Sequence, residues 1–404
     1  MKINAIISEY NPFHNGHAFH LKDAKNSTGA DFSIVIMSGN FVQRGEPAIT
    51  DKYIRAKEAL KNGADLVLEL SPLISSASAG YFAEGAVVNL SKLGVVDTLC
   101  FGAESDDPTG FKNTAKILSA EEHKLKTAIQ ENLKNGQSFA LARQNALCDI
   151  YGAEQGLLSD PNNILALEYE TAILKHKIGF DTYITKRNDP GYNSCETLGN
   201  IASALAIRSL IKENKTIEIT KLLPADFDKT ILKYPVFKDD YSEFLHYKLL
   251  NESLYGFEKY LDVSKDMSER IRIMIPEYRN CTDFCDLLKS KNVAYSTISR
   301  GLLHIFTGLL QERVESYKES GYGKYIKVLG FKKSAAPLLK NISNNAVVPL
   351  IVNKNDYDKY IYKDEKLKFL YHEEMRIESN YDLILHRKYS KNIISDLSKE
   401  AVIM

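Results

Sequence analysis

Short apolar runs alternate with amphipathic stretches along the first half of the chain. The apolar runs, each typical of a buried strand, are residues 3–7, 32–37, 66–70, 98–101 and 180–185. Helical patterns lie between them at 17–25, 51–62 and 81–93, and Asp51 and Gly63 stand at positions that start and end the second helix. This alternation predicts a Rossmann-like α/β fold, in which a parallel sheet is joined by crossover helices.

The pattern changes further along the chain. Residues 110–180 are mainly helical, with a turn and a helix cap at 160–163, and Ser203 is placed to begin a helix that carries Arg208. After about residue 215 the chain becomes mainly helical and rich in tyrosine. We therefore predict two domains, one with the sheet at 1–215 and one mainly helical at 216–404.

Composition and charge narrow the class of protein. With 404 residues and 44% hydrophobic content, the chain can bury a large core. No apolar run is long enough to cross a bilayer, and the N-terminus resembles a strand and not a charged leader, so we expect a cytoplasmic protein. Because the formal net charge is zero, a polyanion has to be recognised by a local patch.

The cysteines give no sign of a metal site. Cys100, Cys148, Cys195, Cys281 and Cys285 form no paired ligand clusters, and their odd number fits reduced intracellular thiols. Cys281 and Cys285 are one helical turn apart, a spacing that favours packing over metal binding.

The candidate chemistry begins with the tetrad His14-Asn15-Gly16-His17, where the first strand gives way to a helix. A helix N-terminus exposes unpaired N–H groups and the positive end of the helix dipole, so it suits a phosphate. Gly16 allows close approach of the backbone, and two imidazoles can donate hydrogen bonds to an oxygen that gains charge during displacement at phosphorus. The segment therefore indicates a nucleoside triphosphate. Incidental histidines in a turn are the alternative, which the strand, the proline turn and the glycine together disfavour.

Other candidate residues stand at the ends of the predicted strands. His14, Ser38, Gly102 and the loop after Ile184 share the carboxyl edge of the sheet, where ligands of parallel sheets bind. Arg208 is either a clamp for a polyphosphate or an ordinary surface arginine. Structural and ligand-binding roles both stay open for the turn at 38–40, the loop tip at 43–45, Asn162, Lys186 and Arg187.

Six motifs follow one another in the first half: EYNPFHNGH, MSGNFVQRGEPAI, GADLVLEL, FGAES, PNNILALEY and IASALAIR. In this order they resemble the bacterial tRNA(Met) cytidine acetate ligase family. This family is part of the HIGH-motif nucleotidyltransferase superfamily, which is related to class I aminoacyl-tRNA synthetases. The resemblance covers about residues 1–210 and continues more weakly in STISRGLLHIFTG and YIKVLGF.

The resemblance implies a HIGH-motif nucleotidyltransferase domain at 1–215 and a tRNA-binding domain at 216–404. Acetate would attack the α-phosphate of ATP to give acetyl-adenylate and pyrophosphate. The exocyclic amine of the wobble cytidine of elongator tRNA(Met) would then take the acetyl group and release AMP.

The same resemblance assigns roles to individual residues. The catalytic residues would be His14 and His17, which would stabilise charge on the α-phosphate and on the leaving pyrophosphate. Mg²⁺ is expected with the triphosphate, although no acidic motif designates a metal site. The residues implied at ATP are Ile7, Ser8, Glu9, Tyr10, Asn11, Pro12, Phe13, His14, Asn15, Gly16, His17, Ala18, Phe19, His20, Gly102, Asn162, Arg187 and Asn188.

Two segments depart from the pattern of the family. Leu205 stands where Thr or Ser is usual, which removes a hydroxyl contact to phosphate and weakens the Arg208 segment as a clamp. Asn193 and Ser194 follow a Gly-Tyr pair where His and Asp are more usual. If these side chains position cytidine or acetate, activity or substrate choice differs in this chain.

A basic segment at 313–340 is interleaved with Tyr317, Tyr322, Tyr325 and Phe331. Basic groups bind phosphates and aromatic rings stack on unpaired bases, so the segment resembles an RNA-binding surface. A solvated, lysine-rich face is the alternative.

Two other functions stay open from the sequence alone. A small-molecule adenylyltransferase would use the same pocket but would leave the helical region without a role. A nucleotide-binding or RNA-binding protein without turnover would fit the departures at Leu205 and Asn193. Pyrophosphate release distinguishes this last function from both enzymes.

Overall fold

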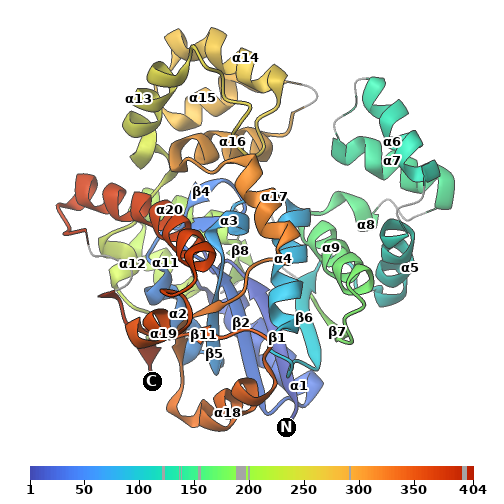
Figure 1. Ribbon diagram of the computed structural model, residues 1–404, viewed down its shortest axis with the longest axis vertical. Coiled ribbons are helices and arrows are strands. Elements are labelled where there is room, and N and C mark those ends of the chain that lie inside the picture. The colour runs from blue at the N-terminus through green and yellow to red at the C-terminus, as the bar shows by residue number, and fades with distance from the viewer. Residues whose placement is uncertain are drawn as a thin grey trace.

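A mostly parallel sheet forms the centre of the molecule (Figure 1). The computed structural model describes residues 1–120, 123–135, 137, 139–152, 156–187, 197–198, 201–290, 293–393 and 398–404. Within them, the central sheet has eight strands in the order β11-β10-β5-β2-β1-β6-β7, and β12 pairs with β10. These strands are β1 (Ile3–Ser8), β2 (Phe32–Ser38), β5 (Leu66–Leu70), β6 (Thr98–Ala103), β7 (Asp181–Lys186), β10 (Ile326–Phe331), β11 (Leu350–Ile351) and β12 (Val402–Ile403).

Helices connect these strands and make up most of the second half of the chain. The first half has α1 (Asn15–Thr28), α2 (Lys52–Lys61), α3 (Pro72–Ser75), α4 (Ala79–Ser91), α5 (Pro108–Ser119), α6 (His123–Lys134), α7 (Phe139–Tyr151), α8 (Gly156–Ser159) and α9 (Pro161–Lys175). The second half has α10 (Ala204–Lys212), α11 (Thr216–Leu222), α12 (Thr230–Lys233), η1 (Lys238–Tyr241), α13 (Ser242–Glu252), α14 (Lys265–Met274), η2 (Ile275–Glu277), α15 (Cys281–Leu287), α16 (Tyr295–Thr307), α17 (Gln311–Glu319), η3 (Lys333–Ala335), α18 (Ala336–Asn345), α19 (Lys354–Tyr360) and α20 (Glu365–Tyr389). Two small hairpins pair β3 (Phe41–Val42) with β4 (Glu46–Pro47), and β8 (Thr197–Leu198) with β9 (Ile201–Ala202).

The five strands predicted from the apolar runs are confirmed. β1 pairs in parallel with β2 and β6, β2 pairs with β5, and β6 pairs with β7. The predicted helices correspond to α1, α2 and α4. Asp51 caps α2 by accepting a hydrogen bond from the Tyr53 amide at 2.8 Å, and Ser203 caps α10 by accepting one from the Ala206 amide at 3.1 Å. The Rossmann-like α/β fold is therefore confirmed.

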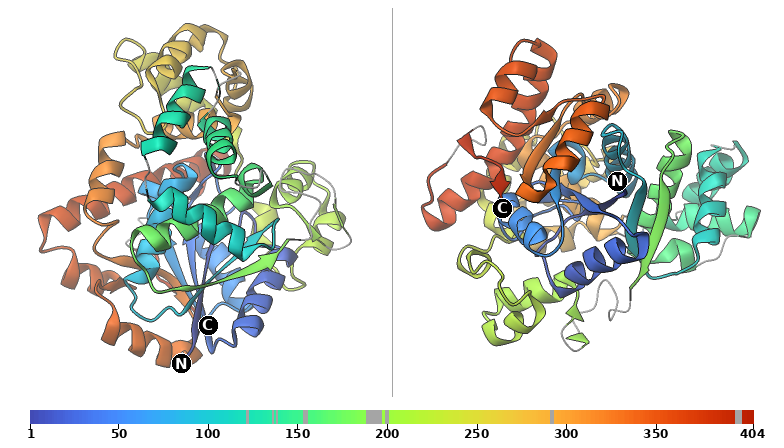
Figure 2. Two further views of the ribbon diagram at one scale, coloured as in Figure 1. Left: turned by 90° about the vertical axis from the view of Figure 1, so that its right-hand side faces the viewer. Right: turned by 90° about the horizontal axis from the view of Figure 1, so that it is seen from below.

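Different helices cover the two faces of the sheet, because side chains alternate along each strand. Ile6 of β1 belongs to a core cluster with Leu21 of α1 and Ala59 of α2. Ala5 of β1 belongs to a second cluster that includes Val87 of α4. Figure 2 shows α1 and α2 on one side of the sheet when the molecule is seen from below. The strands β1, β2, β5 and β6 are buried on both faces, which explains why they are apolar runs in the sequence.

The region after residue 215 is mainly helical, as predicted, but it also completes the sheet. β10 pairs antiparallel with β5, and β11 and β12 pair with β10. Helices α13 to α16 gather at the top of Figure 1, beyond the carboxyl edge of the parallel strands. The boundary between 1–215 and 216–404 stays a prediction, since one sheet takes strands from both sides of it.

The tyrosines of the basic segment do not form the stacking surface that the sequence suggested. Tyr317, Tyr322 and Tyr325 are 5%, 1% and 6% exposed. The hydroxyl of Tyr325 donates to the carboxylate of Glu374 on α20. Because buried rings cannot stack on a base, this expectation is wrong for the three tyrosines. Tyrosine is ambiguous in a sequence, since its ring is apolar while its hydroxyl needs a partner.

The described cysteines have free thiols. Cys281 and Cys285 are buried on α15, and Cys281 donates to the Tyr241 hydroxyl at 3.2 Å, so their predicted packing role is confirmed. Cys195 lies outside the described residues.

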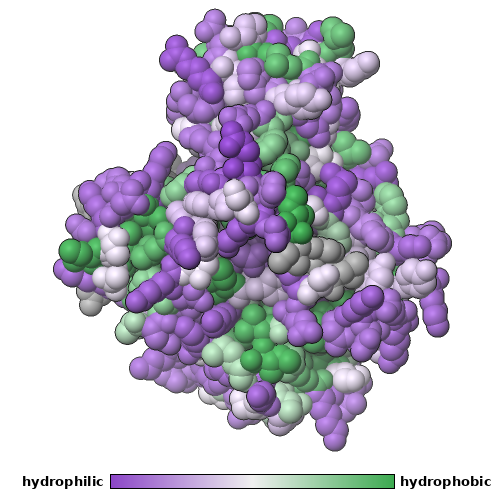
Figure 3. Space-filling model, turned by 90° about the vertical axis from the view of Figure 1, so that its left-hand side faces the viewer, coloured by the Kyte–Doolittle hydropathy of each residue, from purple (hydrophilic) through white to green (hydrophobic). Residues whose placement is uncertain are grey.

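The surface mixes polar and apolar side chains. Figure 3 shows a mostly hydrophilic face in which hydrophobic residues form separate patches. Single exposed apolar residues are usual on globular proteins. Among the helices that the structure describes, none is both long and apolar enough to cross a membrane.

Candidate active site

A pocket of about 950 Å³, open to solvent, lies at the carboxyl edge of β1 and β6. Its lining brings together many of the residues predicted at the nucleotide: Ile7, Ser8, Glu9, Tyr10, Asn11, His14, His17, His20, Gly102, Asn162 and Arg187. The predicted residues outside its lining are Pro12, Phe13, Asn15, Gly16, Ala18 and Phe19. Asn188 lies outside the described residues, as do Asn193 and Ser194. The part that each residue plays in nucleotide binding stays a prediction.

His14 and His17 are held by the backbone at the start of α1. His14 is the N-cap residue, and its Nδ1 accepts a hydrogen bond from the Gly16 amide at 3.1 Å. His17 Nδ1 accepts one from the His14 amide at 3.3 Å, and the two rings stack with centroids 3.7 Å apart. A ring nitrogen that accepts a hydrogen bond carries no proton, so each neutral imidazole carries its proton on Nε2. Both residues line the pocket, so a bound anion could accept a hydrogen bond from their Nε2–H groups.

The electrostatic environment keeps His17 uncharged. Burial lowers the pKa of His17 well below its ordinary value, and the neighbouring His14, Arg187 and His20 lower it further. Burial also lowers the pKa of His20 to about 4, with a further contribution from Arg187. His17 can thus donate a hydrogen bond to an anion without itself carrying charge, and this state persists when the pH falls through 6.5, the ordinary value for histidine.

Arg208 connects α10 to the strand-to-helix turn. Its Nη1 donates to the Asn11 carbonyl at 2.7 Å, and its Nη2 lies 2.9 Å from Glu46 Oε1. The side chain also lines the pocket, so Arg208 is not an ordinary surface arginine. The role of Arg208 as a polyphosphate clamp stays a prediction. Leu205, on the same helix, also lines the pocket.

Arg187 and Asn162 approach the pocket from β7 and α9. Arg187 passes over Gly102, where a Cβ would lie 3.3 Å from Arg187 Cγ. Asn162 Nδ2 donates to Glu104 Oε1 at 2.5 Å. Because α9 begins at Pro161, Asn162 lies within its first turn and is not the N-cap residue, so the capping alternative for Asn162 is wrong.

The pocket also has an apolar wall that the sequence did not reveal. It consists of Phe82 of α4, Phe101 of β6, and Leu165 and Tyr169 of α9. Phe101 is the last residue of a predicted strand, and this position could have marked it as part of the site. The three helical residues have the spacing of ordinary core positions, so no local signal distinguishes them.

The loop at 39–47 brings Gln43 and Arg44 to the pocket. The Arg55 guanidinium of α2 fixes the start of this loop, since it donates to the carbonyls of Glu9 at 2.7 Å, Ser38 at 3.1 Å and Gly39. Ser299 of α16 donates to the Gly45 carbonyl at 2.7 Å. The loop is therefore held by contacts from both halves of the chain.

Gly45→Ala is expected to destabilise the protein more than Gly29→Ala, although both glycines have a positive φ, +75° and +63°. A Cβ at Gly45 would lie 2.3 Å from the Arg300 amide nitrogen, whereas nothing lies within 4 Å of one at Gly29. Left-handed strain alone costs about 1–2 kcal/mol, and overpacking adds about 1–3 kcal/mol at Gly45. Denaturant unfolding of both variants tests this, and equal losses would contradict the packing of the loop on α16.

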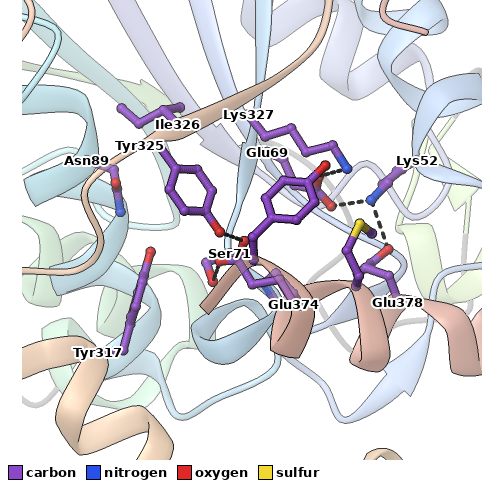
Figure 4. A pocket seen from close by; sticks show the side chains of 13 residues that line it. Lys52, Glu69, Ser71, Asn89, Tyr317, Tyr325, Ile326, Lys327, Glu374 and Glu378 are labelled. Carbon is purple, nitrogen blue, oxygen red and sulfur yellow. Dashed lines mark hydrogen bonds and ion pairs between the residues drawn. The ribbon is translucent and has the colours of Figure 1, made fainter. Parts of the chain in front are cut away.

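A second, much smaller pocket lies behind the loop (Figure 4). In it, Lys52 Nζ lies 2.6 Å from Glu69 Oε1 and 3.1 Å from Glu378 Oε2, and Lys327 Nζ lies 3.3 Å from Glu69 Oε2. The Glu378 carboxylate accepts a hydrogen bond from the Asn40 amide at 3.2 Å. This buried cluster thus ties α20, near the end of the chain, to the loop beside the first pocket.

Known proteins resemble this chain over its length. Residues 1–395 match the family model described as HIGH Nucleotidyl Transferase. The chain is 38% identical over 378 residues to the tRNA(Met) cytidine acetate ligase of Clostridium kluyveri, which covers 88% of this chain and 91% of that protein. It is also similar to two crystal structures of Thermotoga maritima TmcAL, each covering 100% of both chains. The apo form has a TM-score of 0.93 with 31% identity, and the form bound with alpha-thio ATP has a TM-score of 0.89 with 30% identity.

Proposed function

Because the chain belongs to the tRNA(Met) cytidine acetate ligase family of the HIGH nucleotidyltransferases, we infer that it is an ATP-dependent ligase. It acetylates the wobble cytidine of elongator tRNA(Met) with acetate. The reaction passes through acetyl-adenylate, and it releases pyrophosphate and then AMP. The observation that carries this function is the pair of backbone-held histidines, which both line the pocket at the N-terminus of α1.

In the first step, an acetate oxygen attacks the α-phosphate of ATP and the bond to pyrophosphate breaks. Negative charge grows on the phosphate oxygens as this happens. The N-terminus of α1 and the Nε2–H groups of His14 and His17 are suited to stabilise that charge, because they are fixed before the reaction. We propose that the adenosine lies against the apolar wall, with Arg187 and Arg208 near the phosphates.

In the second step, the exocyclic amine of the cytidine takes the acetyl group. We propose that residues 216–404 hold the tRNA, since α16 of this region packs on the loop that carries Gln43 and Arg44. A site for the tRNA on these helices would place the cytidine beside the same pocket. We also propose that the protein acts in the cytoplasm, where its tRNA substrate is used.

Among the described residues, no group of three His, Cys, Asp or Glu side chains is placed to hold a metal ion. The described lining of the pocket therefore does not fit a metal held by the protein alone. We propose that any Mg²⁺ enters with the triphosphate.

Family membership favours this ligase over a small-molecule adenylyltransferase and over a binding protein without turnover. The test measures pyrophosphate release from ATP and acetate, with and without unmodified elongator tRNA(Met), followed by mass analysis of the tRNA nucleosides. We expect pyrophosphate release and an acetylated cytidine. Adenylation of a small metabolite without any acetylated cytidine would support the adenylyltransferase, and ATP binding without pyrophosphate release would support the binding protein.

A further inference from the structure

Acyl transfer to the cytidine amine releases a proton, so the pocket needs a group that accepts it. The described lining has nine titratable side chains: Glu9, Tyr10, His14, His17, His20, Arg44, Tyr169, Arg187 and Arg208. Arginine stays protonated in proteins and a tyrosine hydroxyl keeps its proton at neutral pH, and burial raises the pKa of Tyr10 further. The three arginines and the two tyrosines therefore cannot serve as the base.

The histidines are also poor acceptors. His14 and His17 use Nδ1 to accept backbone N–H groups and carry their protons on Nε2. Burial lowers the pKa of His20 to about 4, which makes it a weak base at neutral pH. Among the titratable groups of the described lining, Glu9 remains.

Glu9 is held firmly at the end of β1. Its Oε1 accepts a hydrogen bond from the Gln43 amide at 2.9 Å. Its backbone carbonyl accepts one from Arg55 Nη1 at 2.7 Å. The carboxylate is thus fixed in the pocket between the strand that leads into α1 and the loop that faces it.

The groups around Glu9 tune its basicity in opposite directions. Burial raises its pKa above the ordinary value, and Glu46 on β4 raises it further. Arg44 of the loop, Arg208 of α10 and the Gln43 amide lower it. The balance is a carboxylate that is more basic than one in water, and such a group is a better general base near neutral pH.

We propose that Glu9 is the general base of the acyl transfer, a role that rests on the proposed function. The cytidine N4 attacks the acetyl carbon and a C–N bond forms. The C–O bond to AMP breaks, and AMP leaves with the bonding electrons as its phosphate anion. The proton lost by N4 moves to the Glu9 carboxylate and then to solvent. The role of base therefore belongs to the second step and not to the first.

Glu9→Gln separates this role from a structural one, because the amide oxygen can still accept from the Gln43 amide. With synthetic acetyl-adenylate and unmodified tRNA(Met), we expect formation of acetylcytidine to fall by about 10²–10⁴. Acetate-dependent exchange of pyrophosphate into ATP reports only the first step and should fall by a much smaller factor, since glutamine keeps the length of the side chain and its acceptor for the Gln43 amide. The matched control is Glu58→Gln, a buried glutamate of α2 outside the pocket lining, which should leave both steps unchanged.

Two outcomes overturn the assignment. If Glu9→Gln slows both steps equally, Glu9 holds the loop and is not the base. If the variant slows neither step, Glu9 has neither role. If the wild-type protein forms no acetyl-adenylate, the proposed function itself is refuted. This result is distinct from the two outcomes above, which concern only Glu9.

The pH dependence of acyl transfer gives a second test. Because the pKa of Glu9 is raised, its basic form is lost as the pH falls through that raised value. Acyl transfer by the wild-type protein should therefore decline toward acid pH while pyrophosphate exchange does not follow the same curve. Protonation of the cytosine ring affects both proteins equally, so Glu9→Gln should lack only the part of the decline that the Glu9 carboxylate causes. Identical profiles for the two proteins would overturn the proposal.

Discussion

Replacing His14 or His17 with asparagine is expected to lower the rate of acetyl-adenylate formation by about 10²–10³ while stability is largely kept. The carboxamide oxygen of asparagine can take the place of Nδ1 and accept the same backbone N–H. Asparagine is also among the preferred N-cap residues, so the start of α1 should remain intact at position 14. The shorter side chain has no atom where Nε2–H stood. The variants therefore remove the proposed donors to the reacting phosphate and little else.

Pyrophosphate exchange and thermal unfolding of the same samples measure the two effects separately. His17→Gln is the complementary variant, because its longer side chain places an amide donor near the former Nε2 while it loses the acceptor for the His14 amide. It should lose stability and keep more of the rate than His17→Asn. Asparagine variants that unfold readily but exchange pyrophosphate at the wild-type rate would show that the histidines only cap the helix.

The central strands could be predicted because each is an apolar run buried on both faces. The partner of a strand is harder to predict, since pairing depends on segments far apart in the chain. β10 illustrates this limit, because its residues pair antiparallel with β5, more than 250 positions earlier. The two-residue strands β11 and β12 are too short to have a period at all.

The same contrast applies to the pocket. Residues at strand ends, such as His14 and Gly102, could be brought together from the sequence because parallel strands end at one edge. Leu165 and Tyr169 could not, since apolar residues on a helix fit a core position equally well. The prediction that Tyr325 lies at the surface is wrong, because its hydroxyl has a partner, Glu374, on a helix distant in the sequence. Local patterns predict elements, whereas distant partners decide what each side chain contacts.

Lys52→Met is expected to lower the free energy of unfolding by about 3–5 kcal/mol, because it removes one partner from a buried ionic cluster. The Lys52 side chain is fully buried and pairs with Glu69 and Glu378, both 4% exposed in their side chains. Burial lowers the pKa of Lys52, but Glu378 and Glu69 outweigh this and raise it well above its ordinary value. The lysine is therefore charged in the folded protein, and methionine would leave Glu378 buried without its ammonium partner.

Lys57→Met on the same helix is the matched control. Lys57 pairs with Asp228 at 3.3 Å, but the two side chains are 44% and 21% exposed, so its loss should cost no more than about 1 kcal/mol. Urea unfolding of both variants at neutral pH measures the difference. Glu378→Gln combined with Lys52→Met should recover part of the loss, since the amide removes the unpaired charge and can still accept from the Asn40 amide. Equal stability of the two single variants would mean that the buried cluster in Figure 4 does not hold α20 to the loop at 39–47.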